Sequence, residues 1–212
     1  PAHLLTGEFF EVLPLAPDRV GFLMGEVFDR GVRSALIVSM LRGLIEKEIA
    51  SAGDAGEFLT GINVGLSHLL LNSGHETKAT AFYGLVDLTK GEIQLSIAGH
   101  VNPMAVFDDG VRQLVPPAYA CGPALGVAEN SSYGKVSAPL TGLRRLICFT
   151  EGFQNTNNVE GKEFGVTRML EEVERGGDLD RVMERLAEAV KDFGGHQEFE
   201  NAICLLGWEI TR

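Results

Sequence analysis

The chain has 212 residues, of which 45% are hydrophobic and 22% charged, and its formal net charge at pH 7 is −11. This composition is typical of a soluble globular protein, and the length is enough for one sizeable domain. The acidic balance argues against a general nucleic-acid binder, which needs a basic face. No apolar run has the length of a transmembrane span, so we expect no membrane insertion.

The three cysteines, Cys121, Cys148 and Cys204, are far apart and lie among apolar residues. Their odd number and wide spacing argue against a disulfide framework or a zinc site. We therefore expect three buried thiols in a reducing cytoplasm. The chain opens on Pro1 rather than Met, as a processed chain or an excised domain does.

In chain order, the sequence first predicts a β-hairpin. Two strand-like runs, EFFEVLP from residue 8 and RVGFLMGEV from residue 19, are separated by the turn-forming residues APD. A helix over residues 32–52 follows, with Gly53 as its stop. Its apolar side chains recur at helical spacing in two sets, Leu36, Met40 and Leu44, and Val38, Leu41 and Ile45, and we expect the helix to bury one face on a sheet.

A second helix is predicted from its N-terminal signal. Asp54 is a favourable N-cap residue, and Glu57 three positions later completes a capping box. The helix is expected to end near Gly74. Its apolar positions are Phe58, Ile62, Leu66 and Leu69.

The rest of the chain predicts several strands, then two helices and a last strand. Two hairpins are predicted, each with a glycine-containing loop between its strands. A Gly/Pro-rich connection then leads to a buried strand that ends in an acid and a glycine. Because strands cluster and helices come in pairs, we expect a single α+β domain over residues 1–212 with antiparallel sheets. The expected elements are strands 79–88, 92–100, 104–107, 111–115 and 143–152, helices 166–175 and 178–193, and strand 202–210.

Several acids lie at strand ends or glycine turns, although they are far apart in the sequence. Carboxylates gathered from several strand ends hold hard divalent cations, because Mg²⁺ and Mn²⁺ prefer oxygen ligands. For each acid taken singly, a solvated charge at a strand end is the alternative interpretation. The acids in question are Glu8, Glu26, Glu151 and the pair Glu200-Asn201.

A set of motifs in fixed order makes this pattern more specific. The segments GEFFEV, GEVFDRG, AGHVNPM, GPALGV, FTEGF and NAICLL span nearly the whole chain. Together they resemble the stage II sporulation E / regulator-of-sigma-B branch of the PPM-type (type 2C) serine/threonine phosphatases. The resemblance implies a 2C-phosphatase-like α-β-β-α sandwich, in which two antiparallel sheets are flanked by paired helices.

The resemblance also implies a chemistry and a cellular setting. Family members hydrolyse phosphoserine or phosphothreonine with water activated between two Mn²⁺ or Mg²⁺ ions. Their typical targets are phosphorylated anti-sigma factor antagonists in cytoplasmic partner-switching pathways. We therefore expect the C-terminal part of a longer bacterial signalling protein, controlled by an upstream sensor or regulator, with a homodimer as one expected assembly.

Residue by residue, the resemblance assigns a metal site whose ligands differ from the family pattern. Three family aspartates become glutamates, and the fourth becomes an amide unless the register shifts by one residue. A glutamate carboxylate lies about 1.5 Å farther from the backbone than that of aspartate, a large displacement for a Mg²⁺ site with ligands at about 2.0–2.1 Å. The assigned positions are Glu8, Glu26, Glu151 and Asn201 or Glu200, with Val27 as a carbonyl ligand.

Two functional readings follow from these substitutions. In one, the glutamates keep the charge and build an altered active site; in the other, the domain binds a partner or relays a signal without hydrolysis. Asn201, together with Phe28 and Asp29 in place of small loop residues, favours impaired or absent hydrolysis. His100 is either a general acid or a turn histidine, and Arg30 and Arg33 are either phosphate ligands or solvated charges.

Overall fold

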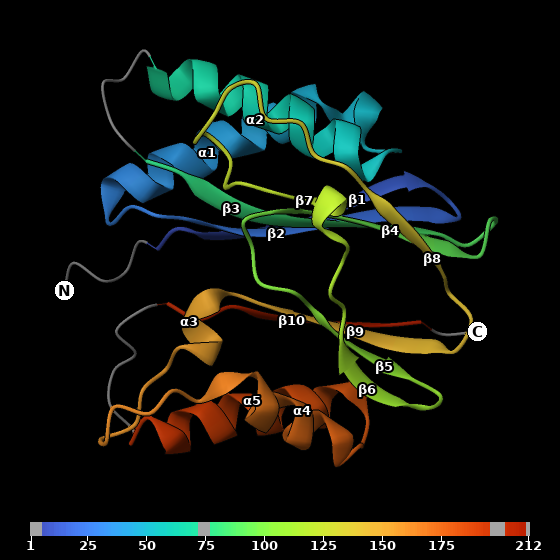
Figure 1. The fold of residues 1–212 in the computed structure, drawn as a ribbon, viewed down its shortest axis with the longest axis vertical. Coiled ribbons are helices and arrows are strands. Elements are labelled where there is room, and N and C mark those ends of the chain that lie inside the picture. Colours follow the sequence, from blue (N-terminus) through green and yellow to red (C-terminus); the bar gives the residue numbers. More distant parts are fainter. Residues whose placement is uncertain (1–5, 72–76, 196–201, 211–212) are drawn as a thin grey trace. The chain divides into compact units, whose positions relative to one another are not determined.

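The structure, a computed structural model, describes residues 6–71, 77–195 and 202–210. It divides into two compact units that alternate along the chain. The first contains residues 1–100 and 116–140, and the second contains residues 101–115 and 141–212. Each unit has an antiparallel sheet with helices along one face (Figure 1). Among the described residues, no helix has both the length and the hydrophobicity of a membrane span.

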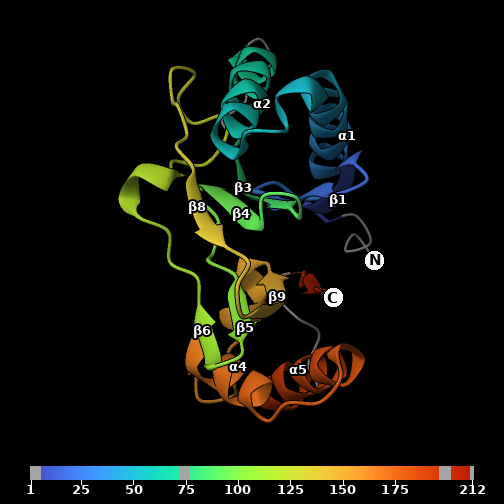
Figure 2. The same ribbon diagram turned by 90° about the vertical axis from the view of Figure 1, so that its right-hand side faces the viewer.

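The sheet of the first unit has the strand order β1-β2-β3-β4, and β4 also pairs in parallel with β7 and antiparallel with β8. Helices α1 and α2 lie side by side over one face of this sheet (Figures 1 and 2). The strands are β1 (Glu8–Ala16), β2 (Arg19–Val27), β3 (Ala79–Asp87), β4 (Glu92–Ala98), β7 (Cys121–Gly122) and β8 (Val136–Pro139). The helices are α1 (Val32–Lys47), η1 (Ile49–Ser51), α2 (Ala55–Leu71) and η2 (Ala118–Ala120).

Strand alternation determines which side chains meet the helices. Successive residues of a strand point to opposite faces, and Phe9, Leu23 and Tyr83 belong to the core that the sheet forms with α1 and α2. The Tyr83 ring lies 4.5 Å from the Phe58 ring, centroid to centroid, and its hydroxyl donates to the Ala52 carbonyl at 2.7 Å. The alternate positions of β1, β2 and β3 therefore belong to the other face of the sheet.

Helix α1 differs from its prediction in its end, and the structure shows which of its faces is buried. It ends at Lys47, and a short 3₁₀ turn follows before Gly53. Leu36 and Met40 are 56% and 45% exposed, whereas Ile37 and Leu41 are buried. Two apolar stripes run along this helix one residue apart, and periodicity alone does not show which of them faces the sheet. Leu36 and Met40 thus lie on the exposed side of α1.

The N-terminus of α2 confirms Asp54 as the N-cap but not the reciprocal half of the capping box, because the Asp54 N–H donates to the Ser51 carbonyl at 2.9 Å. Oδ1 of Asp54 accepts hydrogen bonds from the backbone N–H groups of Gly56 and Glu57, at 3.0 and 3.2 Å. The Asp54 carboxylate also pairs with Lys135, which ties the chain before β8 to the start of α2. The helix is described as far as Leu71, and the expected end near Gly74 lies outside the described residues.

The sheet of the second unit has the order β10-β9-β5-β6. Helices α4 and α5 cover one of its faces, where Met169 and Leu186 pack with Ile147 and Phe149 in a second core. The predicted cap of α5 is confirmed, because Asp178 accepts a hydrogen bond of 2.9 Å from the Arg181 N–H. The elements are β5 (Met104–Phe107), β6 (Gly110–Gln113), β9 (Leu143–Phe149), α3 (Glu151–Gln154), α4 (Gly165–Glu174), α5 (Leu179–Phe193) and β10 (Leu205–Glu209).

Two further features differ from the sequence prediction. The strand expected over residues 143–152 ends at Phe149, because the chain turns into the short helix α3 at Glu151. All three cysteines are free thiols, but only Cys148 is buried, whereas Cys204 is half-buried and Cys121 is exposed. Burial raises the pKa of the Cys148 thiol, which keeps it protonated at neutral pH. The expectation of three buried thiols is thus wrong for Cys121.

The Asp54 cap leads to a test of stability against pH. Burial alone raises the pKa of Asp54, but hydrogen bonds from Lys135 and two backbone N–H groups outweigh it and hold that pKa below its ordinary value of 3.8. A lowered folded-state pKa means that the carboxylate stabilises the fold above the unfolded-state pKa and loses this effect as the pH falls through the folded-state pKa. Asp54→Asn should therefore lower the free energy of unfolding by about 1 kcal/mol at neutral pH.

The measurement is urea unfolding at a series of pH values between about 7 and 2. The gap between wild type and Asp54→Asn should close as the pH falls below the ordinary pKa of the carboxyl group. Asp180→Asn, which removes an exposed carboxylate from the first turn of α5, is the matched control. If the difference in unfolding free energy between wild type and Asp54→Asn stayed constant over the whole pH range, the stabilising role of the ionised Asp54 carboxylate would be contradicted.

Candidate functional site

Glu8 and Glu26 lie opposite each other at one end of the first sheet. Glu8 is the first residue of β1, Glu26 is the last but one of β2, and the two are register partners in the antiparallel ladder. Because Phe9 and Val27 belong to the core under the helices, alternation places both glutamates on the other face. Side chains directly opposite in such a ladder have Cβ atoms about 4.5–5.5 Å apart. The structure thus brings two of the predicted carboxylates together.

The environment of Glu8 indicates what the pair requires. Its Oε2 atom is buried and has no hydrogen-bond partner within the described part of the chain. A buried charged oxygen without a partner is costly, and the half-buried Glu26 across the ladder adds a second negative charge. A cation between the two carboxylates would remove both penalties.

The Val27 carbonyl, the predicted main-chain ligand, lies beside the glutamates and is closely approached by Gly7. A Cβ atom on Gly7 would come within 2.3 Å of the Val27 oxygen. The Val27 N–H donates to the Gly7 carbonyl at 2.9 Å, and the Val27 carbonyl accepts from the Asp29 N–H at 2.9 Å. A carbonyl oxygen has two lone pairs, so this bond leaves one available for a cation.

The loop between β2 and α1 carries the substituted family positions. Phe28 is 43% exposed, and the Lys78 ammonium lies 5.1 Å from the centre of its ring. Asp29 accepts from the Arg30 N–H at 2.9 Å and pairs with Arg33 at 3.5 Å. Both arginines are exposed, as expected of solvated charges at the start of a helix.

The second acid of GEFFEV lies away from the pair. Glu11 is an odd number of positions from Glu8, so it belongs to the helix-facing side of β1. It forms an ion pair of 2.8 Å with Arg42 of α1. This partner gives Glu11 a structural role and makes it a natural control for the two glutamates on the other face.

Sequence reasoning missed Thr80 and left the role of His100 open. Thr80 of β3 is the register partner of Glu26, so Glu8, Glu26 and Thr80 form one row across three strands. The Thr80 hydroxyl lies 3.0 Å from Nδ1 of His100, which follows β4. The strand register that creates this row is the signal that could have identified Thr80, and it depends on pairing between distant segments.

Glu151 belongs to the second unit, where it opens α3. It is half-buried, and its Oε1 accepts a hydrogen bond of 3.2 Å from the Asn155 amide. The preceding residue, Thr150, is fixed to Cys204 by two hydrogen bonds: the Thr150 N–H donates to the Cys204 carbonyl at 3.0 Å, and the Cys204 N–H donates to the Thr150 hydroxyl at 2.9 Å. Glu200 and Asn201 lie outside the described residues.

The donor set of the first unit fits a hard divalent cation in part. Glu8, Glu26 and the Val27 carbonyl offer oxygen atoms, which Mg²⁺ and Mn²⁺ prefer. Among the described residues, no group of three or more His, Cys, Asp or Glu side chains is placed to hold a metal. The described residues of the first unit thus supply only part of the ligand set that a metal ion needs.

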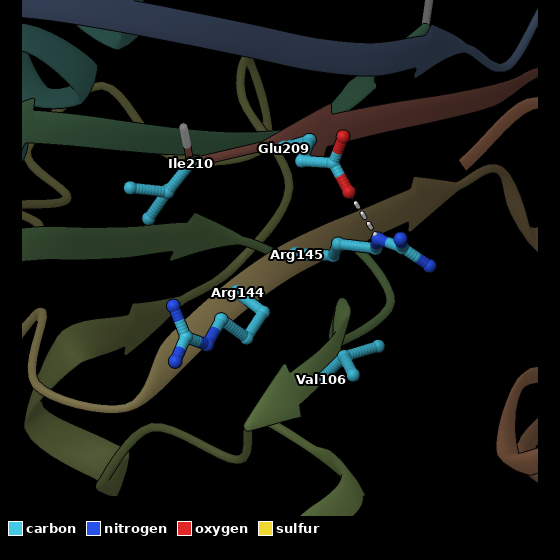
Figure 3. Close-up of a pocket in the computed structure, with 5 residues that line it drawn as sticks. All are labelled: Val106, Arg144, Arg145, Glu209 and Ile210. Atoms are coloured by element: carbon cyan, nitrogen blue, oxygen red, sulfur yellow. Dashed lines mark hydrogen bonds and ion pairs between the residues drawn. The ribbon is translucent and has the colours of Figure 1, made fainter. Parts of the chain in front are cut away.

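A separate pocket of about 390 Å³ lies on the second unit (Figure 3). The ladder there is irregular, because Phe107 of β5 pairs with Leu143 although Val106 pairs with Arg145. The intervening Arg144 bonds to Asp108, while Arg145 bonds to the Glu209 carboxylate and the Gly177 carbonyl, each at 2.6 Å. The pocket is lined by Val106, Arg144, Arg145, Glu209 and Ile210.

This pocket is distinct from the predicted acid site. None of Glu8, Glu26 and Glu151 is among its lining residues. Both arginines already bind carboxylates, so the pocket presents a largely neutralised surface. It therefore offers less to a charged substrate than the Glu8-Glu26 pair offers to a cation.

Comparisons with known proteins match this chain over nearly its whole length. The model of a family described as stage II sporulation protein E (SpoIIE) matches residues 16–209. Protein IcfG from Synechocystis is 23% identical over 195 residues, covering 81% of this chain and 30% of that protein. Phosphoserine phosphatase RsbP from Bacillus subtilis is 25% identical over 150 residues, covering 70% and 36%. The chain thus spans about a third of the length of these relatives.

Solved structures confirm the predicted fold class. The SiaA-PP2C domain of Pseudomonas aeruginosa matches with a TM-score of 0.84 at 19% identity, covering 100% of this chain and 82% of that one. The RsbU and RsbW domains of Rv1364c from Mycobacterium tuberculosis match with a TM-score of 0.76 at 23% identity, covering 96% and 56%. The fold is that of the PPM (2C-like) phosphatases.

The close approach of Gly7 to Val27 provides a test of the site's backbone. Gly7→Ala places a methyl group 2.3 Å from the Val27 carbonyl oxygen, so the strand ends must shift, at a cost of about 1–3 kcal/mol in unfolding free energy. Gly43→Ala is the matched control, because a Cβ there meets nothing within 4 Å and alanine favours a helix by about 1 kcal/mol. Denaturant unfolding of both variants should give opposite signs; equal signs would contradict the packing described.

Proposed function

The chain belongs to the stage II sporulation protein E family of PPM-type phosphatase domains, and we propose that it is a metal-dependent serine/threonine phosphatase domain with impaired hydrolysis. The observation that carries this proposal is the buried, unpartnered Oε2 of Glu8 opposite Glu26. That arrangement supports binding of a hard cation. The matched family range includes Glu26, Glu151 and Asn201 and begins after Glu8.

In this proposal the chain's own residues position the cation and the phosphate. Glu8 and Glu26 would hold Mn²⁺ or Mg²⁺ through carboxylate oxygens, with the Val27 carbonyl beside them. The family resemblance adds Glu151 and either Asn201 or Glu200 as further ligands. When bound, the ions supply Lewis acidity and lower the pKa of a coordinated water. The burial of the Glu8 Oε2 atom limits its contact with bulk water, which strengthens the attraction of this carboxylate for a cation.

The impairment follows from ligand length and charge. Each glutamate moves its carboxylate outward by about 1.5 Å relative to aspartate, while octahedral Mg²⁺ tolerates little departure from about 2.0–2.1 Å. A single aspartate-to-glutamate replacement can be accommodated by a different side-chain rotamer. Three longer carboxylates, by contrast, would have to fit around the same metal site. Asn201 further removes one negative charge from the ligand set.

A catalytically inactive domain that binds a protein or relays a signal is the alternative. It is favoured by the loop after Val27, where the bulky Phe28 under Lys78 and the ion-paired Asp29 replace small residues. In either case we propose a phosphorylated anti-sigma factor antagonist, or another phosphoserine or phosphothreonine protein, as the partner. The cytoplasm is the proposed location. An upstream sensor or regulator would belong to the part of a longer chain that relatives have beyond this domain.

Calorimetric titration with Mn²⁺ tests the proposal. The unmodified domain should bind Mn²⁺ weakly and hydrolyse a generic phosphoester very slowly. Glu8→Gln and Glu26→Gln should each weaken Mn²⁺ binding by about tenfold or more, because each removes a charged ligand. Glu11→Gln, on the opposite face of β1, should change the affinity by less than about twofold. Turnover typical of an ordinary metal-dependent phosphatase would contradict the impairment, and equal effects of all three variants would contradict the site.

A second experiment asks whether ligand length causes the impairment. The combined variant Glu8→Asp, Glu26→Asp, Glu151→Asp and Asn201→Asp restores the shorter acids and the missing charge. If length and charge limit the site, Mn²⁺ affinity should rise by about tenfold or more, and phosphoester turnover should rise with it. An unchanged affinity would assign the impairment to the Phe28-Asp29 loop instead.

A further inference from the structure

Strand β1 is the outer strand of the first sheet, and its free edge begins at the candidate cation site. Among the described residues, β1 pairs with β2 alone. An outer strand presents main-chain N–H and C=O groups that a further strand can bind. Glu8 opens β1 and lies opposite Glu26, so a strand added at this edge would place one of its own residues beside the two carboxylates.

The hydrogen-bonding pattern shows which residues of β1 are available at this edge. In an antiparallel ladder, hydrogen-bonded residue pairs alternate with pairs that are not hydrogen-bonded. The Val27 N–H donates to the Gly7 carbonyl at 2.9 Å, so the odd-numbered residues of β1 turn their main-chain groups toward β2. The even-numbered residues therefore turn theirs to the free edge, until Pro14, which has no N–H, ends it. The available residues are Glu8, Phe10 and Val12.

The side chains of these residues add an exposed apolar surface next to the carboxylates. Phe9 and Leu13 belong to the core under the helices, so the even-numbered side chains lie on the other face of the sheet. Phe10 is 48% exposed and Val12 is 45% exposed. The edge thus offers main-chain partners and two apolar contacts, and it starts at the candidate cation site.

The charge at this edge distinguishes between possible occupants. β1 contains two acids and no base, so a second copy paired at the same edge would bring no positive charge to Glu8. A phosphorylated residue carries a charge of about −1.5 to −2 at pH 7, which is complementary to a cation held there. A residue directly opposite Glu8 has its Cβ atom about 4.5–5.5 Å from that of Glu8, within reach of such a site.

We propose that β1 is the docking strand for the phosphorylated segment of the partner protein. The segment adds to the free edge as an antiparallel strand, with its phosphoserine or phosphothreonine opposite Glu8. Apolar residues two and four positions before the phosphorylated residue then lie opposite Phe10 and Val12. Main-chain hydrogen bonds supply affinity in this mode of recognition, and alternate side chains supply specificity. The proposal rests on the proposed function, because it takes the cation site as the point that receives the phosphate.

The first test is amide hydrogen exchange of the domain, followed by NMR in Mg²⁺. In the free domain, the N–H groups of Phe9 and Glu11 should be protected and those of Phe10 and Val12 should exchange rapidly. A peptide with valine two and four positions before phosphoserine should slow exchange at Phe10 and Val12 by about tenfold or more. Unchanged exchange would overturn the proposal. Protection that rises with protein concentration in the absence of peptide would assign the edge to a second copy and would also overturn it.

The second test measures the affinity of this peptide by fluorescence anisotropy. Phe10→Ala should weaken binding by about tenfold, because it removes an apolar contact. Leu69→Ala, which truncates an exposed leucine of α2, is the matched control and should change the affinity by less than about twofold. Val12→Pro removes an outward N–H without breaking a bond to β2, so it should bind about threefold to tenfold more weakly than Val12→Ala.

The main-chain contact can also be tested from the peptide, with the unmodified domain. Methylation of the main-chain nitrogen of the valine opposite Phe10 removes a donor to β1 and should weaken binding by about threefold to tenfold. Methylation of the residue between the two valines, whose N–H points away from β1, should have no such effect. Equal effects of the two methylations would overturn strand addition.

The results separate failure of this inference from failure of the proposed function. If the unmodified domain does not bind Mn²⁺, the proposed function fails, and the unphosphorylated valine peptide then decides whether β1 accepts a strand. If Glu8→Gln weakens Mn²⁺ binding but Phe10→Ala and Val12→Pro leave peptide binding unchanged, the cation site stands and the docking role is overturned. Phe10→Ala itself should change Mn²⁺ affinity by less than about twofold.

Discussion

The pairing register of β1, β2 and β3 is the constraint on which the candidate site depends. It aligns Glu8, Glu26 and Thr80 in one row. Because side chains alternate between faces, a slip of one residue would turn each of them toward α1 and α2, into the apolar core. Moving both carboxylates into that core without partners would be strongly unfavourable. The chemistry of one face is thus enforced by the packing of the other.

The same register is held by contacts on the helix side of the sheet. Tyr83 binds the Ala52 carbonyl through its hydroxyl and packs on Phe58 of α2. Gly21 allows this ring to approach, since a Cβ there would lie 2.2 Å from the Tyr83 hydroxyl oxygen. The ion pair of Glu11 with Arg42 joins β1 to α1. Stability and site geometry therefore share one set of contacts, and a change that loosens the helix layer also affects the carboxylate row.

Local signals in the sequence were sufficient for most elements, whereas contacts between distant segments were not. The first hairpin and the caps at Asp54 and Asp178 depend on neighbouring residues, and the structure confirms them. The buried face of α1 depends on where the sheet lies, which its two apolar stripes do not reveal. The motifs predicted that Glu8 and Glu26 belong together. The Thr80-His100 contact was missed because it needs both the β2-β3 register and the turn at Gly99, and the last acid position, at Glu200 or Asn201, lies outside the described residues.

The two proposed functions, a phosphatase with impaired hydrolysis and an inactive binding domain, differ in whether phosphate is hydrolysed. Both leave the negative charges of Glu8 and Glu26 to be neutralised. A buried carboxylate oxygen without a partner, with a second acid opposite it, destabilises the fold unless something neutralises it, whether or not phosphate is turned over. Replacing aspartate by glutamate keeps this electrostatic demand and changes only where the oxygen atoms lie. A domain that had lost any use for the cation would be more stable with neutral side chains at both positions. The presence of both acids, with Oε2 of Glu8 buried and unpartnered in the described structure, therefore supports the proposed cation binding more directly than it supports catalysis. In the proposed function, affinity for the metal and turnover are therefore separate properties.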